Sequence, residues 1–208
     1  NYSGNKKGSE SMRKKKEYRS AIRSRKLIRE AFSKLMKEKS IDKITVTDIV
    51  NAADINRGTF YAHFKDTRSI IAQIENEIID KMNQILSKFD FANILDHAWQ
   101  MFLEIEKIIE QDYDIFVKLI DAPGSEQFLD KLRNTAINNL FLNKKLPEEV
   151  KKSKEFSLRV NYFGGGMVNL YLRWFKKEVD CSLRDISNEL YKQIKLLKQL
   201  FLDEQQLG

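Results

Sequence analysis

Apolar residues recur at three- and four-residue steps along almost the whole chain, and only two prolines interrupt this pattern in 208 residues. Such spacing places the apolar side chains on one face of an α-helix. The first clear stripe lies between Arg19 and Glu38, and the last runs from Leu183 to Phe201. No segment shows the strict alternation that is typical of a strand. The sequence therefore predicts an all-α fold of about nine helices.

The ends of these helices follow from capping residues, turns and the two prolines. The expected helices cover residues 19–38, 45–53, 56–63, 66–89, 91–110, 112–121, 125–143, 147–177 and 182–203. Pro147 suits the first position of its helix, where the missing N–H costs nothing. Residues 1–18 are polar and lysine-rich, so they are expected to form a flexible basic arm.

Charge is unevenly distributed along the chain. The first 68 residues contain 18 Lys or Arg and 8 Asp or Glu, whereas the remaining residues contain 19 and 22, within a total net charge of +7. A basic first third indicates contact with a polyanion such as nucleic acid. A solvated lysine-rich face would give the same counts, so charge alone leaves both interpretations open.

Other features of the composition exclude several classes of protein. No apolar run approaches the roughly 20 residues that a bilayer span requires, and no export signal follows the basic N-terminus. Cys181 is a single cysteine, which excludes an intrachain disulfide. We therefore expect a soluble protein of the cytoplasm that does not associate with membranes.

The segment after the first stripe predicts two short helices joined by a tight turn. Thr45 and Asp48 have the spacing of a capping box at the start of one helix. Asn56 is a favourable N-cap for the next helix. Asp54 lies between them and tolerates the left-handed conformation of a tight turn. Two short helices behind a longer basic helix form a helix-turn-helix.

The second of these short helices contains residues suited to contact DNA. Arg57 presents a planar fork that matches the edge of guanine in the major groove, and Thr59 offers a hydroxyl and a methyl group. Gly58 costs roughly 1 kcal/mol in a helix, which indicates close approach of the backbone to another surface. The side chains that can donate to phosphates are Tyr61, His63 and Lys65. Phe60 and Phe64 are expected to be core residues.

The segment from Lys43 to Phe64, with its Thr-Phe-Tyr-x-His-Phe core, resembles the DNA-binding domain of the TetR family of bacterial transcriptional regulators. The similarity covers residues 19–75. It implies a DNA-binding domain over 19–66 and a helical effector-binding and dimerisation domain over 67–208. It also implies a repressor that a small molecule releases from a palindromic operator. The positions that match DNA-facing positions of the family are Thr47, Asn56, Arg57, Gly58, Thr59, Tyr61, His63 and Lys65.

The last two expected helices are candidates for an interface between two copies of the chain. Each carries an apolar stripe, and three consecutive glycines, Gly164 to Gly166, would weaken the penultimate helix unless another helix approached closely. The family implies a homodimer through a four-helix bundle. The interface residues we expect are Phe163, Gly165, Met167, Leu170, Trp174, Leu190, Ile194 and Leu197. Packing within one subunit is the alternative.

The middle helices supply aromatic side chains that could line a pocket for an unidentified small molecule. These residues are Trp99, Phe102, Phe116, Phe128, Tyr162 and Tyr171. For each of them taken singly, an ordinary core position is the favoured interpretation and the pocket wall is the alternative. His97 has no second His or Cys at metal-ligand spacing, so neither a metal nor a cofactor is expected.

The sequence contains none of the catalytic motifs that would indicate an enzyme. The hypothesis it favours is a sequence-specific DNA-binding regulator, a repressor released by a small-molecule effector. Two alternatives remain. One is a TetR-like activator, and the other is a helical protein-interaction module with only non-specific affinity for DNA.

Overall fold

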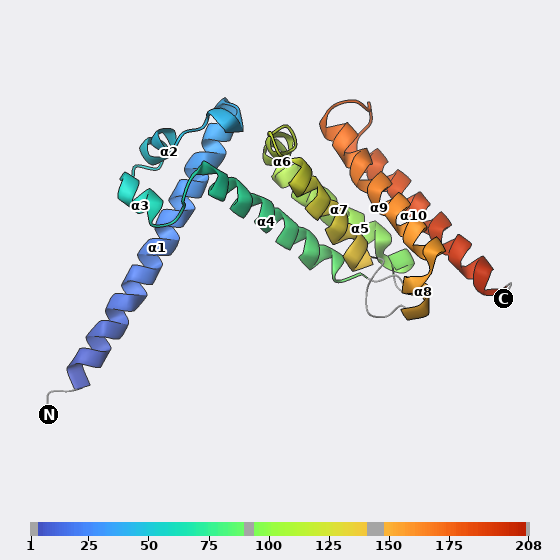
Figure 1. Ribbon diagram of the computed structural model, residues 1–208, viewed down its shortest axis with the longest axis horizontal. Helices are drawn as coiled ribbons and strands as arrows, with labels where there is room; N and C mark the ends of the chain where they lie inside the picture. Colours follow the sequence, from blue (N-terminus) through green and yellow to red (C-terminus); the bar gives the residue numbers. More distant parts are fainter. Residues whose placement is uncertain (1–3, 90–93, 141–147, 207–208) are drawn as a thin grey trace. The chain divides into compact units, whose positions relative to one another are not determined.

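The computed structural model describes residues 4–89, 94–140 and 148–206, and every regular element in these ranges is helical (Figure 1). The chain divides into two compact units, Asn1–Ile74 and Glu75–Gly208. The division falls inside helix α4 (Thr67–Leu86), later in the chain than the domain boundary expected after residue 66. None of the helices in the described ranges is both long and apolar enough to cross a membrane.

The first unit consists of α1, a short 3₁₀ turn, α2, α3 and the beginning of α4. Their bounds are Gly4–Glu38 for α1, Ile41–Lys43 for the 3₁₀ turn, Val46–Ala52 for α2 and Arg57–Tyr61 for α3. Helix α1 packs against α2 and α3. The side chains at the centre of this unit are almost completely buried and comprise Ile28, Phe32, Met36, Ile49, Phe60 and Ile70.

Helix α1 is longer than the sequence pattern predicts. Residues 4–18 are helical, whereas we expected a flexible arm over residues 1–18. The scarcity of apolar residues there indicates only that the segment lacks a packed face. Lys, Arg, Glu and Met are nevertheless good helix formers, and a helix already nucleated over residues 19–38 gains one hydrogen bond for each residue added.

Within the described residues, the second unit contains the rest of α4 and six further helices. These are α5 (Ile94–Gln111), α6 (Tyr113–Ile120), α7 (Glu126–Leu140), α8 (Glu148–Lys152), α9 (Lys154–Phe175) and α10 (Leu183–Gln206). Helix α10 packs along α5, and α9 packs along α7. The core of this unit therefore lies between these helix pairs and is built from residues of the predicted apolar stripes.

The helix expected over residues 147–177 is divided into α8 and α9. Ser153 has an extended backbone, with φ −68° and ψ 140°, and its hydroxyl accepts a hydrogen bond from the backbone N–H of Phe156 at 3.1 Å. Serine in this conformation caps the N-terminus of a new helix rather than continuing the preceding one. Pro147 lies outside the described residues.

Candidate nucleic-acid interface and effector cavity

The capping box that begins α2 is present and is reinforced from α1. Oδ2 of Asp48 accepts hydrogen bonds from the backbone N–H of Thr45 at 2.8 Å and from its hydroxyl at 2.7 Å. The N–H of Asp48 donates to the Thr45 hydroxyl at 3.2 Å. The Lys39 ammonium lies 2.7 Å from the same carboxylate oxygen. The predicted cap is therefore confirmed, and Lys39 additionally joins the end of α1 to the start of α2.

These donors stabilise the ionised form of Asp48. The hydrogen bond from Lys39, followed by those from Thr45, lowers the pKa of Asp48 from its ordinary value of 3.8 to about 2. The carboxylate thus contributes stability above pH 3.8, and we expect this contribution to be lost as the pH falls from 3.8 through about 2. A ¹³C NMR titration of the Asp48 carboxyl carbon measures the midpoint directly. A midpoint near 4, as in an unstructured peptide, would contradict the cap.

The turn between α2 and α3 has the predicted conformation. Asp54 has φ 51°, in the left-handed region, and Asn56 caps α3 by accepting a hydrogen bond from the N–H of Thr59 at 2.7 Å. A Cβ atom at Gly58 would lie 3.3 Å from this capping oxygen of Asn56, closer than ordinary contact. A side chain at position 58 would therefore crowd the cap of α3, which explains a glycine there in addition to the close approach to DNA that we expected.

Two phenylalanines hold α3 on the first unit. Phe60 is fully buried, Phe64 is nearly so, and their ring centroids lie 6.1 Å apart. The guanidinium of Arg25 on α1 covers the Phe64 ring at 5.6 Å. The prediction that both phenylalanines are core residues is confirmed, and their burial turns the opposite face of α3 outward.

The residues predicted to contact DNA are accessible. Thr59 and His63 are partly exposed, and the more exposed members are Thr47, Asn56, Arg57, Gly58, Tyr61 and Lys65. Nη2 of Arg57 donates a hydrogen bond to the Thr47 hydroxyl at 2.6 Å, which joins α3 to α2. This pairing was not evident from the sequence, because the two residues lie on different helices. It holds the Arg57 fork at the outer surface, where it can meet a base edge.

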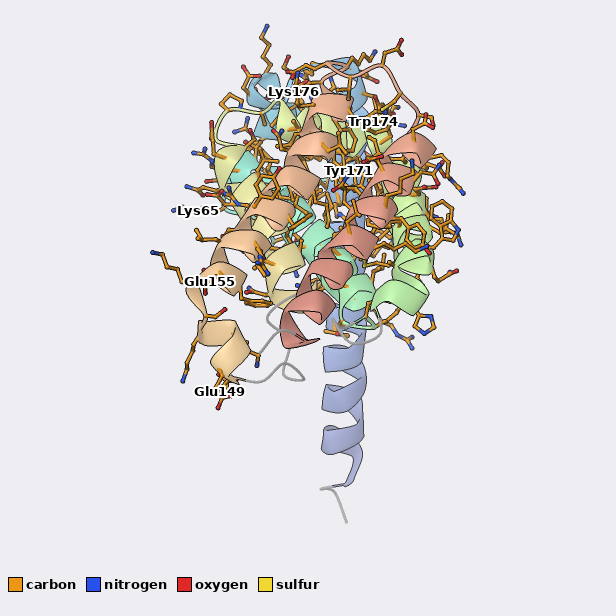
Figure 2. The ribbon with its side chains drawn as sticks, turned by 90° about the vertical axis from the view of Figure 1, so that its right-hand side faces the viewer. Lys65, Glu149, Glu155, Tyr171, Trp174 and Lys176 are labelled. Carbon is orange, nitrogen blue, oxygen red and sulfur yellow. The ribbon has the colours of Figure 1, made fainter. Side chains whose placement is uncertain are left out.

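Exposed cationic side chains also occur along α1. The exposed ones between residues 18 and 38 are Arg19, Arg23, Arg25, Lys26, Lys34 and Lys37. Lys65 follows α3 and is also exposed to solvent (Figure 2). Such residues attract and contact phosphates without reading sequence. The first unit therefore combines a potential base-reading helix with a cationic surface.

The predicted interface residues of the second unit face in different directions. Met167, Leu190 and Ile194 are at most 7% exposed and pack inside the unit, so they do not lie on an outer surface of the protomer. Phe163, Gly165, Leu170 and Trp174 are partly exposed, and the side chain of Leu197 lies outside the described residues. The outermost large apolar side chains here are Leu158, Tyr162 and Leu196.

The three glycines of α9 have different environments. A Cβ atom at Gly164 would lie 2.5 Å from Cγ1 of Ile137 on α7, whereas Gly165 and Gly166 face open space. The close approach of helices that we expected therefore exists at Gly164 and occurs within one subunit. Gly165 remains available to a second copy of the chain.

An apolar cavity of about 70 Å³ lies in the second unit, enclosed by residues of α4, α5, α6, α7 and α9. Phe116 and Tyr171 line it, as does Met167, which we had expected at the dimer interface. Tyr171 lies on the side of α9 near α10 (Figure 2). This cavity offers room for a small molecule beside two of the predicted aromatic residues.

Other predicted pocket residues lie elsewhere. Phe102 and Phe128 are fully buried core residues, and Trp99 packs on Tyr191 with ring centroids 5.8 Å apart. Tyr162 is 77% exposed, so the prediction that it lines the pocket is not supported. Tyr162 and Tyr171 are nine positions apart, which places them on opposite faces of a helix with 3.6 residues per turn. That spacing could have excluded Tyr162 from the pocket. No group of three or more acidic, His or Cys side chains suited to a metal ion occurs among the described residues.

A capped pair of short helices on a basic helical unit defines a helix-turn-helix protein. Residues 28–74 match the sequence profile of the family described as "Bacterial regulatory proteins, tetR family". The helix-turn-helix segment of this chain is therefore similar to that of TetR-family regulators.

Two curated relatives are similar to part of this chain. One is the HTH-type dhaKLM operon transcriptional activator DhaS of Lactococcus lactis subsp. lactis (strain IL1403), which is 31% identical over 120 residues, or 54% of this chain and 62% of the relative. The other is YvdT of Bacillus subtilis (strain 168), described as an uncharacterized HTH-type transcriptional regulator. It is 34% identical over 109 residues, or 50% of this chain and 55% of the relative. The aligned part thus spans less than two thirds of either relative.

The overall fold is similar to that of solved TetR-family structures. A putative TetR-family transcriptional regulator from Syntrophomonas wolfei str. Goettingen superimposes with a TM-score of 0.65 and 16% identity. The superposition covers 84% of this chain and 94% of that structure. At this level of identity, the comparison supports the two-part helical architecture and nothing finer.

Proposed function

We propose that this protein is a sequence-specific DNA-binding regulator of transcription that binds a palindromic operator as a homodimer. The observation that carries the proposal is the exposed Arg57 fork, held by Thr47 on the outer face of a capped helix-turn-helix. Base edges in the major groove are read by such side chains, and the surrounding cations supply affinity that is independent of sequence.

Replacing Arg57 or Lys65 by alanine is expected to affect DNA binding in different ways. Arg57 lies at the start of α3 and can reach a base edge, so Arg57→Ala should cost about 1–3 kcal/mol on the operator and relax preference at one base pair in each half-site. Lys65 lies beyond α3 and reaches the backbone of DNA. Lys65→Ala should weaken binding to all duplexes and lower the salt slope by roughly one per subunit.

Titrations on operator and scrambled duplex at several salt concentrations separate these two roles. The matched control is Lys107→Ala, since Lys107 is an exposed cation of α5 in the second unit. It should leave both affinities unchanged. Equal losses of free energy on both duplexes for Arg57→Ala would show that Arg57 contacts only phosphate.

The dimer of this proposal forms through the outer faces of α9 and α10. Leu158 and Tyr162 lie four residues apart on one face of α9 and are 63% and 77% exposed, and Leu196 on α10 is 52% exposed. Large exposed apolar side chains that recur on a helix face are typical of a protein interface. Gly165 lies on α9 with open space above it, which allows a second helix to approach.

We expect Tyr162→Asp to weaken the dimer by about 2 kcal/mol or more, roughly 30-fold in dissociation constant, because it places a charge at the centre of an apolar contact. Gly165→Leu should also weaken dimerisation, although the protomer has room for the new side chain. Sedimentation at tens of micromolar measures both effects, with Lys107→Asp as the control. A wild-type protein that sediments as a stable monomer would refute the interface.

A small molecule bound in the apolar cavity of the second unit would regulate DNA binding. It must have different affinities for the DNA-bound and free conformations of the dimer, since equal affinity shifts no equilibrium. In the usual scheme of the family, the effector releases a repressor. Activation is a second candidate because the relative from Lactococcus lactis is described as an activator. In vitro transcription from a promoter beside the mapped operator distinguishes repression from activation. Added protein lowers the transcript yield if it is a repressor and raises the yield if it is an activator.

A further inference from the structure

The outer face of α9 carries a stripe of residues that recur at alternating three- and four-residue steps. Its members are Glu155, Leu158, Tyr162, Gly165, Asn169, Leu172 and Lys176, the last of which is the C-cap of the helix. None of them is buried, and Leu158 and Tyr162 are the most exposed large apolar side chains of this helix. Residues with this spacing stay in contact with a second helix over many turns when the two cross at about 20°.

The stripe has opposite charges at its two ends and no side chains at its centre. Glu155 lies in the first turn of α9 and Lys176 at its C-cap, and both are labelled in Figure 2. Gly165 and Gly166 lie midway between these charges, with open space where a Cβ atom would stand. Two copies of α9 that cross nearly antiparallel at the glycines therefore place Glu155 of each copy opposite Lys176 of the other. A parallel pair would instead bring like charges together, which is unfavourable.

A groove beside the stripe has room for the protruding tyrosine. It lies between α7 and α9, has a volume of about 260 Å³, and includes Gly165 and Asn169 in its wall. The α7 side of the groove is lined by Glu126, Leu129, Asp130 and Arg133. Tyr162 and Asn169 lie equally far from the midpoint between the glycines, so the antiparallel crossing brings Tyr162 of one copy over Asn169 of the other. A phenol ring, apolar with one hydroxyl, suits a groove with apolar and charged walls.

We propose that two copies of the chain pair through this face of α9, antiparallel and centred on Gly165 and Gly166, and that Tyr162 of each copy inserts into the α7–α9 groove of the other. This proposal rests on the homodimer proposed above and specifies its register and the contribution of α7. The twofold axis repeats every contact, so one stripe supplies two ion pairs and two tyrosine contacts. Exposed ion pairs add little affinity, whereas matched charges fix the register of an interface.

Single cysteines introduced into α9 measure the register directly. In a Cys181→Ser background, Gly166→Cys places the new thiol beside its own counterpart at the twofold axis, so oxidation should link the dimer. Leu158→Cys is the matched control, because it lies on the same exposed face but about 22 Å from its counterpart along the helix axis, at 1.5 Å per residue. It should not link. Linkage of Leu158→Cys, or its absence in Gly166→Cys, would overturn the proposal.

Charge reversal tests the two ion pairs. Glu155→Lys and Lys176→Glu should each raise the dissociation constant of the dimer about tenfold at low salt, because each creates two contacts between like charges. An equimolar mixture of the two variants should recover the wild-type affinity, since the mixed dimer again pairs opposite charges at both ends. Sedimentation measures all three, and Lys107→Glu on α5 is the control that should change nothing. A mixture that dimerises no better than its components would contradict the antiparallel register.

Filling the groove tests the tyrosine contact. Leu129→Trp should raise the dissociation constant of the dimer about tenfold by excluding Tyr162 from the groove, and Tyr162→Ala should do the same. The combined variant should lose little more than either alone, because both remove one contact. Gln127→Trp is the control, since Gln127 is exposed on α7 but does not line the groove. Full additivity of the two losses would place Tyr162 outside the groove.

The register and the proposed function can fail separately. A dimer that binds its operator specifically but links through Leu158→Cys overturns the register and leaves the DNA-binding function intact. A dimer that links through Gly166→Cys but binds all duplexes equally supports the register and refutes the sequence-specific function.

Discussion

Phe60→Ala is expected to destabilise the first unit by about 3–5 kcal/mol, which is a large share of the total stability of a small domain. Phe60 is completely buried and packs against Phe64 at the centre of the helix-turn-helix. Removing the ring leaves a cavity and releases α3, a helix of only five residues that cannot remain folded without tertiary packing. Specific DNA binding should be lost together with the structure.

Urea denaturation followed by circular dichroism measures this effect, and Tyr61→Ala is the matched control. Tyr61 is the next residue of the same helix and is 54% exposed. Its ring meets that of Phe60 edge-on with centroids 5.4 Å apart, so its replacement should cost about 0.5–1.5 kcal/mol, well below the loss for Phe60→Ala. A loss below 1 kcal/mol for Phe60→Ala, by the same scale, would mean that Phe60 does not hold α3 in place.

The second large effect is expected at Gly164, where α9 meets α7. A Cβ atom there would lie 2.5 Å from Cγ1 of Ile137, a nearly buried atom close to the backbone that has little freedom to move. Gly164→Val should therefore destabilise the second unit by about 3 kcal/mol through overpacking. Helix propensity alone would make valine slightly more stabilising than glycine, so a loss of stability would be due to the contact with Ile137.

Gly166→Val provides the control for Gly164→Val because it introduces the same side chain two positions later, where the space is open. We expect a change within about 0.5 kcal/mol in thermal denaturation at fixed protein concentration. Ile137→Ala should relieve part of the cost of Gly164→Val, so that the two losses are less than additive. Full additivity would place the source of the strain elsewhere.

The helix-turn-helix is predictable from the sequence because the interactions that form it are local. The cap formed by Thr45 and Asp48, the turn at Asp54 and the cap at Asn56 each depend on residues within a few positions of one another. Side-chain chemistry at such short range has few alternatives, so residue type and spacing were sufficient.

The sequence predicts less where the structure depends on contacts between residues far apart in the chain. An apolar stripe identifies the buried face of a helix, but it does not distinguish burial within one subunit from burial against a second copy. Met167, Leu190 and Ile194 were placed at a dimer interface for this reason, and they pack inside the unit. The division at Ser153 was missed because serine also occurs inside helices, and only its extended backbone shows that it is a cap.

In the candidate sites, too, residue types follow from the sequence, whereas contacts between helices do not. Arg57 was identified from its residue type, whereas its hydrogen bond to Thr47 depends on how α2 and α3 pack. Glu106 and Ser187 gave no signal in the sequence, since a single Glu or Ser on a helix is usually a surface residue. Their burial beside Tyr171 follows from the packing of three helices.

The proposed function requires that this helix-turn-helix binds a specific DNA sequence. Selection of bound duplexes from a random pool, followed by footprinting and titration of the selected site, measures this specificity. We predict a bounded footprint with inverted half-sites whose centres lie about one helical turn or a multiple apart. We also predict at least about 1,000-fold tighter binding than to a scrambled duplex at the same salt concentration. Equal affinity for both duplexes without a bounded footprint would contradict the account and would support a helical interaction module with only non-specific affinity for DNA.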